Sequence, residues 1–369
     1  IEFQNDEDNS KFSVGDVFLA KVRKSVPGLN AAFVNVGYHK DAFLHYHDLG
    51  PKLPTLMKFM KRVSTGKLKD YSLKNVTFEE DIKKDGSIDA IIKSNQSILV
   101  QIAKEPISTK GPRISSEISL AGRYLVLVPF SDRISISQKI ESRKEKERLK
   151  RLVRSITPKG FGVIIRTVAT DKKVAELDKD LQNLYSKWES ICKAIPRAHT
   201  PSKVLGEMNK ASSILRDIFN DTFTGITVDD DLLFNQIKDY VHEIAPHKEA
   251  IVKYHNPKTP IFEKFGIERQ IKTSFGKTVS MARGAYLIIE HTEALHVVDV
   301  NSGNRSSKER NQEATALEVN ILAATELARQ FRLRDMGGII VVDFIDMNKA
   351  ENRKKLFDHL RNEMKDDRA

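Results

Sequence analysis

The chain has 369 residues, with 61 Lys and Arg against 50 Asp and Glu, a net charge of +11 and a sequence pI near 9.4. This length exceeds one ordinary hydrophobic core and predicts roughly two to four domains. Cys192 is the only cysteine, which excludes a disulfide or a zinc cluster built within the chain. The apolar runs are of strand length and the N-terminal stretch is acidic, so we expect no membrane segment, no signal peptide and a cytoplasmic protein. The basic excess favours a polyanionic partner, most simply nucleic acid, over solubility charge alone.

Short strands with glycine-bearing turns predict a small β-barrel in the first third of the chain. The first pattern, 12–22, is a turn leading into a strand, and further strand patterns lie at 31–37, 41–45 and 97–102. Between the third and fourth, the pattern dissolves into a lysine-rich stretch, 51–80, that we interpret as an insertion in the barrel.

Several side chains of the predicted barrel could contact a ligand. Phe33 and Phe43 could stack on RNA bases from an exposed face or fill the barrel core, and spacing alone favours the core. The basic loop at Lys110 tilts this balance towards RNA. The histidines at 39, 45 and 47 lack the supporting ligands of a metal site, so we interpret them as surface or packing residues.

The middle of the chain alternates strands and helices. Strands are predicted at 123–129, 162–167, 225–228 and 250–254, and helices at 140–156, 172–193, 203–219 and 231–244. Arg166 and Thr167 follow a strand and could bind a phosphate through the guanidinium fork and the hydroxyl. Without further information, a surface arginine and a strand-forming threonine are favoured. A phosphate-loop-like run at 274–278 is rejected because Ile271 occupies the position of the required glycine.

The strongest candidate site lies near the C-terminal end of the sequence. The strand pattern 294–300 leads into Asp299 and Asn301, and strand alternation places these two side chains on one face. A long predicted helix, 309–334, connects this strand to a second one that ends at Asp343, with Asp346 as a weaker candidate. A strand–helix–strand crossover is parallel, so both strand ends should meet at one sheet edge. Two carboxylates and an amide oxygen suit a hard divalent cation such as Mg²⁺.

At this point the sequence closely resembles the ribonuclease E/G family. The residues that carry the resemblance are AAFV at 31–34, GVIIRT at 162–167, TEAL at 292–295, DVNS at 299–302, RLRD at 332–335 and GGIIVVDFIDM at 337–347. These motifs span nearly the whole chain in order, and the run GLNAAF at 28–33 is more similar to the ribonuclease G branch.

The resemblance implies a multidomain α/β and β fold. Its parts would be an OB-type, S1-like RNA-binding barrel at 1–122, a 5′-phosphate sensor region at 123–202, a ribonuclease H-like subdomain at 203–272 and a deoxyribonuclease-like α/β catalytic subdomain at 273–369. Three departures from the family pattern are noted. Gln138 stands where the sensor can carry a basic residue, the strand usual before the barrel is missing, and the zinc-linking cysteines and small C-terminal domain are absent.

The implied activity is Mg²⁺-dependent cleavage of single-stranded RNA within the chain, stimulated by a 5′-monophosphate, with Mn²⁺ as a substitute ion and no zinc site. By this resemblance Asp299 and Asp343 bind the metal, and Asn301 positions the reacting phosphate. Arg166, Thr167 and Val126 would form the 5′-phosphate sensor, and Phe33, Phe43 and Lys110 would contact RNA in the barrel. The family implies rRNA processing, mRNA turnover and a homo-oligomer for the full-length protein. The alternative is a non-catalytic RNA-binding protein with structural carboxylates.

Overall fold

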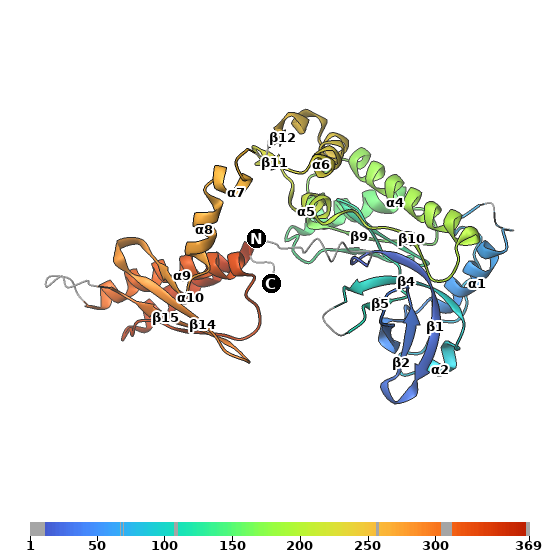
Figure 1. The fold of residues 1–369 in the computed structure, drawn as a ribbon, viewed down its shortest axis with the longest axis horizontal. Helices are drawn as coiled ribbons and strands as arrows, with labels where there is room; N and C mark the ends of the chain where they lie inside the picture. The colour runs from blue at the N-terminus through green and yellow to red at the C-terminus, as the bar shows by residue number, and fades with distance from the viewer. Residues whose placement is uncertain are drawn as a thin grey trace. The chain divides into compact units, whose positions relative to one another are not determined.

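The computed structural model of the chain describes residues 12–66, 68, 70–106, 110–255, 258–303 and 312–366. The chain forms two compact units that divide between Thr224 and Gly225 (Figure 1). No helix in these described ranges is both long and apolar enough to cross a membrane.

A closed barrel begins the first unit, as the sequence predicted. Its strands are β1 (Val17–Val26), β2 (Ala31–Asn35), β3 (Ala42–His45), β4 (Ser97–Lys104) and β5 (Arg113–Ser115), with short helices η2 (Pro27–Leu29), η3 (Tyr46–Asp48) and α2 (Ile88–Ile91) between them. The strand order is β1-β2-β3-β5-β4, and β1 also pairs with β4, which closes the sheet. The barrel therefore has no free edge between its first and last strands.

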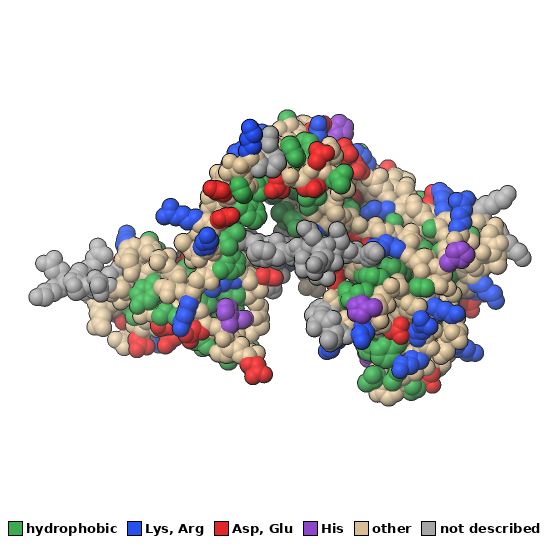
Figure 2. Space-filling view, in the orientation of Figure 1, with side chains coloured by type: hydrophobic (Ala, Val, Ile, Leu, Met, Phe, Trp, Pro, Cys, Tyr) green, Lys and Arg blue, Asp and Glu red, His purple; other side chains and the backbone are tan. Residues whose placement is uncertain are grey.

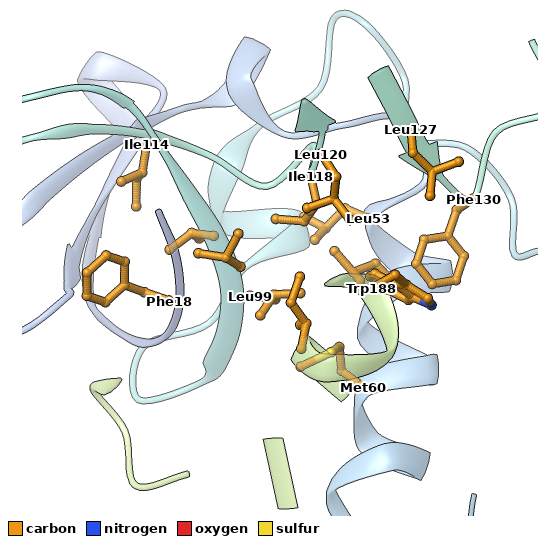
Figure 3. Close-up of a cluster of buried hydrophobic side chains, with 14 of the residues drawn as sticks. Phe18, Leu53, Met60, Leu99, Ile114, Ile118, Leu120, Leu127, Phe130 and Trp188 are labelled. Carbon is orange, nitrogen blue, oxygen red and sulfur yellow. The ribbon is translucent and has the colours of Figure 1, made fainter. Parts of the chain in front are cut away.

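Two segments differ from the predicted pattern. Residues predicted as the start of a helix at 203 form a strand instead, β10 (Ser202–Leu205), which pairs with β1 outside the barrel. The stretch predicted as an insertion contains α1 (Leu53–Ser64), whose apolar side is buried. Figure 3 shows Leu53 and Met60 of α1 packed in one cluster with Leu99 of the barrel and with Trp188. The stretch thus supplies a large part of the hydrophobic core.

A second sheet in the same unit has the order β6-β7-β9-β8. Its strands are β6 (Leu120–Ala121), β7 (Leu125–Pro129), β8 (Ile134–Ile136) and β9 (Phe161–Ile165), and its helices are α3 (Arg143–Ile156), η4 (Thr167–Ala169), α4 (Val174–Ala194), η5 (Ile195–Arg197) and α5 (Lys210–Ile218). The inward side chains of β7 and β9 and the apolar stripe of α4 belong to the same core as the barrel. The strands predicted at 123–129 and 162–167, and the helices at 140–156 and 172–193, are confirmed to within a few residues.

The second unit begins with a small parallel pair of strands. This part contains β11 (Ile226–Val228), α6 (Asp231–Ile244), η6 (Pro246–Ile251), β12 (Val252–Tyr254), α7 (Ile261–Lys264) and α8 (Ile267–Ser274). The strand predicted at 250–254 begins at Val252, because a 3-10 helix occupies the residues before it. The ribonuclease H-like assignment of this region stays a prediction, as do the four domain boundaries.

A four-stranded sheet, ordered β13-β14-β15-β16, completes the second unit. Its elements are β13 (Thr278–Ser280), η7 (Ala282–Gly284), β14 (Tyr286–His291), β15 (His296–Asn301), α9 (Gln312–Arg334), β16 (Ile340–Asp343), α10 (Ala350–Glu363) and η8 (Met364–Asp366). Strands β15 and β16 are parallel, which confirms the predicted crossover. The sequence spacing of Ser306 and Glu309 predicts a capping box for the long helix, and both residues lie outside the described ranges.

Candidate active site and RNA contacts

Strand β15 separates its side chains between the two faces of the sheet. Val298 and Val300 are buried in a core with Val319 and Leu327 of α9, whereas Asp299 between them is exposed. Asn301 is half-buried and, by alternation, lies on the same face as Asp299. The predicted placement of these two polar side chains on one face is therefore confirmed.

The second carboxylate lies directly beside the first. Asp343 of β16 is the register partner of Asp299 in the parallel ladder, and its side chain is also exposed. Neighbouring strands run about 4.8 Å apart, so the two carboxylates lie within reach of one small ion. Figure 2 shows Asp and Glu side chains along the lower edge of the unit that carries β14 and β15.

Asn301 is coupled to this pair. Its Nδ2 donates a hydrogen bond to Asp299 Oδ2 at 2.7 Å, which orients the amide and the carboxylate relative to each other. A side-chain amide has one oxygen acceptor, and in this orientation the Oδ1 of Asn301 is not used by Asp299. The three side chains therefore present carboxylate and amide oxygens together at the end of β15 and β16.

This donor set fits a hard divalent cation. Within the described ranges, no group of three or more His, Cys, Asp and Glu side chains is arranged to hold a metal. Mg²⁺ does not need such a group, because it keeps several water ligands and is commonly held by one or two carboxylates. Structural zinc requires four protein ligands, usually Cys or His, and does not fit these residues.

The chain that follows Asp343 is held by two polar side chains of α9. Asn320 is fully buried, donates from Nδ2 to Ile345 O at 2.7 Å and accepts from Ile345 N at 3.0 Å. Near the start of α9, the Glu313 carboxylate accepts hydrogen bonds from the backbone N–H groups of Lys349 and Asn348, which hold the pKa of Glu313 below its ordinary value. These contacts fix the segment between Asp343 and α10.

Sequence reasoning missed both anchors. The available signal was Asn320 itself, a polar residue in the otherwise apolar stretch at 319–324 of a long helix. Asp346, the weaker predicted candidate, is exposed one residue beyond the anchored Ile345.

In the first unit, Arg166 is positioned by two neighbours at the end of β9. Its NH1 donates to Gly122 O at 2.8 Å and its NH2 donates to Asp217 Oδ1 of α5 at 2.7 Å. Burial raises the pKa of Asp217, but the hydrogen bond and positive charge of Arg166, with Arg216, outweigh burial and lower this pKa overall. A guanidinium has five N–H groups, so two used in positioning leave others for an anion.

Thr167 and Val126 lie near Arg166. The Thr167 hydroxyl is 3.1 Å from the Ser137 hydroxyl, and Arg166 N donates to the carbonyl oxygen of Tyr124, the residue before β7. Val126, two residues further on β7, is paired with the exposed Ile164 of β9. The structure thus brings the three predicted sensor residues together, with an apolar spot beside polar donors. Gln138 is exposed next to Ser137 and adds no positive charge there.

The aromatic pair of the barrel lies on its outer surface. Phe33 and Phe43 are register partners on β2 and β3, with ring centroids 5.9 Å apart, and both are partly exposed. Their neighbours along the strands, Ala32 and Leu44 among them, are fully buried. The core placement that spacing favoured is therefore wrong. The Nζ of Lys24 lies 5.5 Å from the centre of the Phe33 ring, which adds a cation to this surface.

Lys110 is exposed in the loop that leads to β5. A Cβ on the next residue, Gly111, would lie only 2.2 Å from Asp41 O, so a glycine permits the close approach of this loop to the start of β3. Phe43 N also donates to Pro112 O at 2.8 Å. These contacts place the predicted basic loop beside the strand that carries Phe43.

Comparison with known proteins decides the family. The family model described as "Ribonuclease E/G family" matches residues 119–369. The chain belongs to the ribonuclease E/G family. The match covers the catalytic and sensor candidates from Val126 to Asp343, whereas the barrel candidates precede it. The resemblance inferred from the motifs is thereby confirmed.

Members of the ribonuclease E/G family with curated names are similar over 96% of this chain. Ribonuclease G of Escherichia coli (strain K12) is 33% identical over 356 residues, which cover 69% of its length. Ribonuclease G of Haemophilus influenzae is 34% identical over 355 residues and 68% of its length. Ribonuclease E of Nostoc sp. is 33% identical over 360 residues, or 48% of its length. Both kinds of ribonuclease thus match this chain over nearly its whole length.

Proposed function

We propose that this protein is a divalent-metal-dependent endoribonuclease that cuts single-stranded RNA and uses Mg²⁺, with Mn²⁺ as a substitute. The observation that carries the proposal is the pairing of Asp299 with Asp343 on an exposed sheet face, in a chain of the ribonuclease E/G family. Asn301, hydrogen-bonded to Asp299, adds an amide beside the two carboxylates. Carboxylate pairs of this kind serve metal-assisted hydrolysis of phosphodiesters.

The residues of the site would have distinct roles. Asp299 and Asp343 would bind the cation, which when present lowers the pKa of a bound water and stabilises charge on the phosphate. Asn301 holds the Asp299 carboxylate in one orientation and would position the reacting phosphate. Hydrolysis forms a bond from a water oxygen to phosphorus and breaks the bond from phosphorus to the 3′ oxygen. The products are a 5′-phosphate and a 3′-hydroxyl.

The sensor residues support stimulation by a 5′-monophosphate. Arg166, already oriented by Asp217, and the Thr167 hydroxyl would bind the terminal phosphate. Val126, with Ile164 beside it, would contact the terminal nucleotide. Because Gln138 carries no charge, the preference for a monophosphate should be weaker than with a basic residue at that position.

The barrel would hold a more distant part of the RNA. Phe33 and Phe43 expose ring surface on which bases can stack, and Lys24 and Lys110 supply positive charge for the backbone. By the family resemblance we further infer rRNA processing and mRNA turnover in the cytoplasm, by a homo-oligomer of the full-length protein.

A second candidate is a non-catalytic RNA-binding protein. It is favoured by one observation, that the described residues contain two paired carboxylates but no larger group of metal-binding side chains. This candidate predicts RNA binding that weakens with salt, together with no cleavage under any metal condition.

Cleavage of a 5′-monophosphorylated, AU-rich single-stranded RNA by the full-length protein separates the two candidates. We expect cleavage with Mg²⁺, none with excess chelator, and products whose new ends are a 5′-phosphate and a 3′-hydroxyl. Cleavage that continues in chelator, or products with a cyclic phosphate, would contradict the proposed chemistry. Binding without cleavage in all conditions would favour the second candidate. A matched RNA with a 5′-hydroxyl tests the sensor, because its cleavage should be slower.

A further inference from the structure

Helix α3 concentrates positive charge. Its 14 residues contain seven Lys and Arg against two Glu, a net charge of +5, whereas the whole chain of 369 residues has a net charge of +11. Nearly half of the net charge of the protein is therefore carried by a helix about 21 Å long. A surface that serves solubility normally mixes both signs, so this helix differs from that pattern.

The two acidic residues of α3 are both neutralised within the helix. Arg148 binds Glu145 through two hydrogen bonds of 2.7 Å, which is the main reason that the pKa of Glu145 is lowered to about 2. Arg143 pairs with Glu147 at 3.2 Å. These pairs leave the other basic side chains of the helix without an acidic partner on α3.

Four of the remaining basic side chains form a continuous surface. Leu149 and Val153 are fully buried and fix which side of α3 faces the protein. On the opposite side lie four exposed residues with no ion pair to any described residue, which we call the α3 stripe: Lys144, Lys150, Arg151 and Arg154. With 3.6 residues per turn, they fall within an arc of about 120° and extend over about 15 Å.

The α3 stripe lies beside Thr167, one of the residues proposed to sense the 5′ end of the RNA. A pocket of about 840 Å³ is lined by Lys144 and Arg151 of the stripe and by Thr167. Its acidic lining residues are Glu145 and Glu147, which are paired with Arg148 and Arg143, together with Glu141 and Asp171. Thr167 is a proposed ligand of the 5′-phosphate. A phosphate chain that starts at Thr167 can therefore continue past this pocket onto the stripe, where the exposed basic side chains have no acidic partner on α3.

We propose that the α3 stripe binds internal backbone phosphates of the substrate RNA, next to its 5′ end. The proposal rests on the proposed function, because it takes single-stranded RNA as the ligand. The stripe has no aromatic side chain to stack on a base, and flexible Lys and Arg side chains contact phosphates without reading sequence. The stripe therefore adds affinity that depends on salt but not on sequence or on the chemical group at the 5′ end.

The test is RNA binding by a variant in which all four residues are replaced: K144Q, K150Q, R151Q and R154Q together. Glutamine has a helix propensity close to that of Lys and Arg, and all four side chains are exposed, so the fold should be kept; circular dichroism checks this. Fluorescence anisotropy with a labelled single-stranded RNA, in chelator to prevent cleavage, measures the dissociation constant from low to high salt.

We expect the affinity to fall by a similar factor for RNAs with a 5′-monophosphate and a 5′-hydroxyl. The plot of the logarithm of the association constant against the logarithm of salt concentration should become less steep by up to about 2.8, because each of four phosphate contacts to single-stranded RNA contributes about 0.7 to the slope. A control variant removes the same charge elsewhere in the first unit, at four exposed lysines: K61Q, K83Q, K84Q and K93Q. The control should change affinity and slope much less.

Three results would overturn the proposal. The first is an unchanged RNA affinity of the stripe variant. The second is an equal loss of affinity in the control variant, which would assign the effect to net charge. The third is a loss of affinity confined to the 5′-monophosphate RNA, which would assign the stripe to binding of the 5′ end. Failure of the proposed function is distinguishable, since it would appear as an absence of cleavage by the unmodified protein. The binding comparison in chelator does not depend on cleavage.

Discussion

Replacing Asn320 with alanine should loosen the segment that follows Asp343. Asn320 is fully buried on α9 and makes two hydrogen bonds, of 2.7 and 3.0 Å, to the backbone O and N of Ile345. Each bond contributes roughly 1 kcal/mol net, and a buried group left without a partner costs more. Because Ile345 is only half-buried, water can replace part of the loss, and about 2 kcal/mol is expected for the variant.

Hydrogen exchange measures this loss locally. A local destabilisation of about 2 kcal/mol corresponds to roughly 30-fold faster exchange of amides that open with the segment 344–349. The comparison is made by mass spectrometry on peptides that cover this segment, in the unmodified protein, in Asn320→Ala and in Asn362→Ala. Asn362 is an exposed residue of α10, so its replacement should leave exchange nearly unchanged. Equal exchange in all three proteins would refute the anchoring role of Asn320.

Three further predictions concern the first unit. The pKa of Glu145 is lowered to about 2, so its pairing with Arg148 stabilises the protein above pH 4.5, and this stabilisation is lost as the pH falls from 4.5 towards 2. The free energy of unfolding in urea should therefore be lower for Glu145→Gln than for the unmodified protein at pH 6, and the two values should converge near pH 2. Cys192 is fully buried, and burial raises the pKa of its thiol. Thiol reagents at pH 8 should therefore label it only after denaturant unfolds the protein, and rapid labelling of the native protein would contradict this burial. Phe33→Ala should weaken single-stranded RNA binding by about 1–3 kcal/mol while Phe33→Tyr keeps most of the affinity, and equal binding by both variants would exclude base stacking.

The paired carboxylates could be predicted because the strand and helix patterns of the sequence contain the required information. Alternation along one strand places Asp299 and Asn301 on one face, and a parallel crossover fixes Asp343 near them. The first rule depends on neighbouring residues only, and the second on the order strand–helix–strand along the chain. The register that makes Asp299 and Asp343 direct partners is a detail that the structure added.

Contacts between distant residues were not predictable in this way. The anchoring of Arg166 by Asp217, 51 positions away, depends on where α5 packs against the second sheet. The pairing of β10 with β1 joins residues near 203 to residues near 18, and the helical spacing of the local sequence gave no sign of it. Asn320 likewise hydrogen-bonds Ile345, 25 positions away and beyond the end of β16.

The face of the barrel on which Phe33 and Phe43 lie could not be predicted from the sequence for a different reason. A period of two tells which residues share a face but not which face is inside. The buried positions beside the two rings on β2 and β3 are Ala32, Val34, Ala42 and Leu44. The two rings lie on the other, partly exposed face, although spacing alone favoured the core.

The most direct test of the central claim is the cleavage rate of Asp343→Asn beside that of Asp358→Asn. Both substitutions remove one exposed carboxylate, but only Asp343 is the register partner of Asp299. With Mg²⁺ and a 5′-monophosphorylated single-stranded RNA, the account predicts that Asp343→Asn of the full-length protein loses at least about 100-fold in rate. It should still bind the RNA, and Asp358→Asn should cleave at the unmodified rate. Cleavage by Asp343→Asn at a rate equal to that of Asp358→Asn would contradict the account.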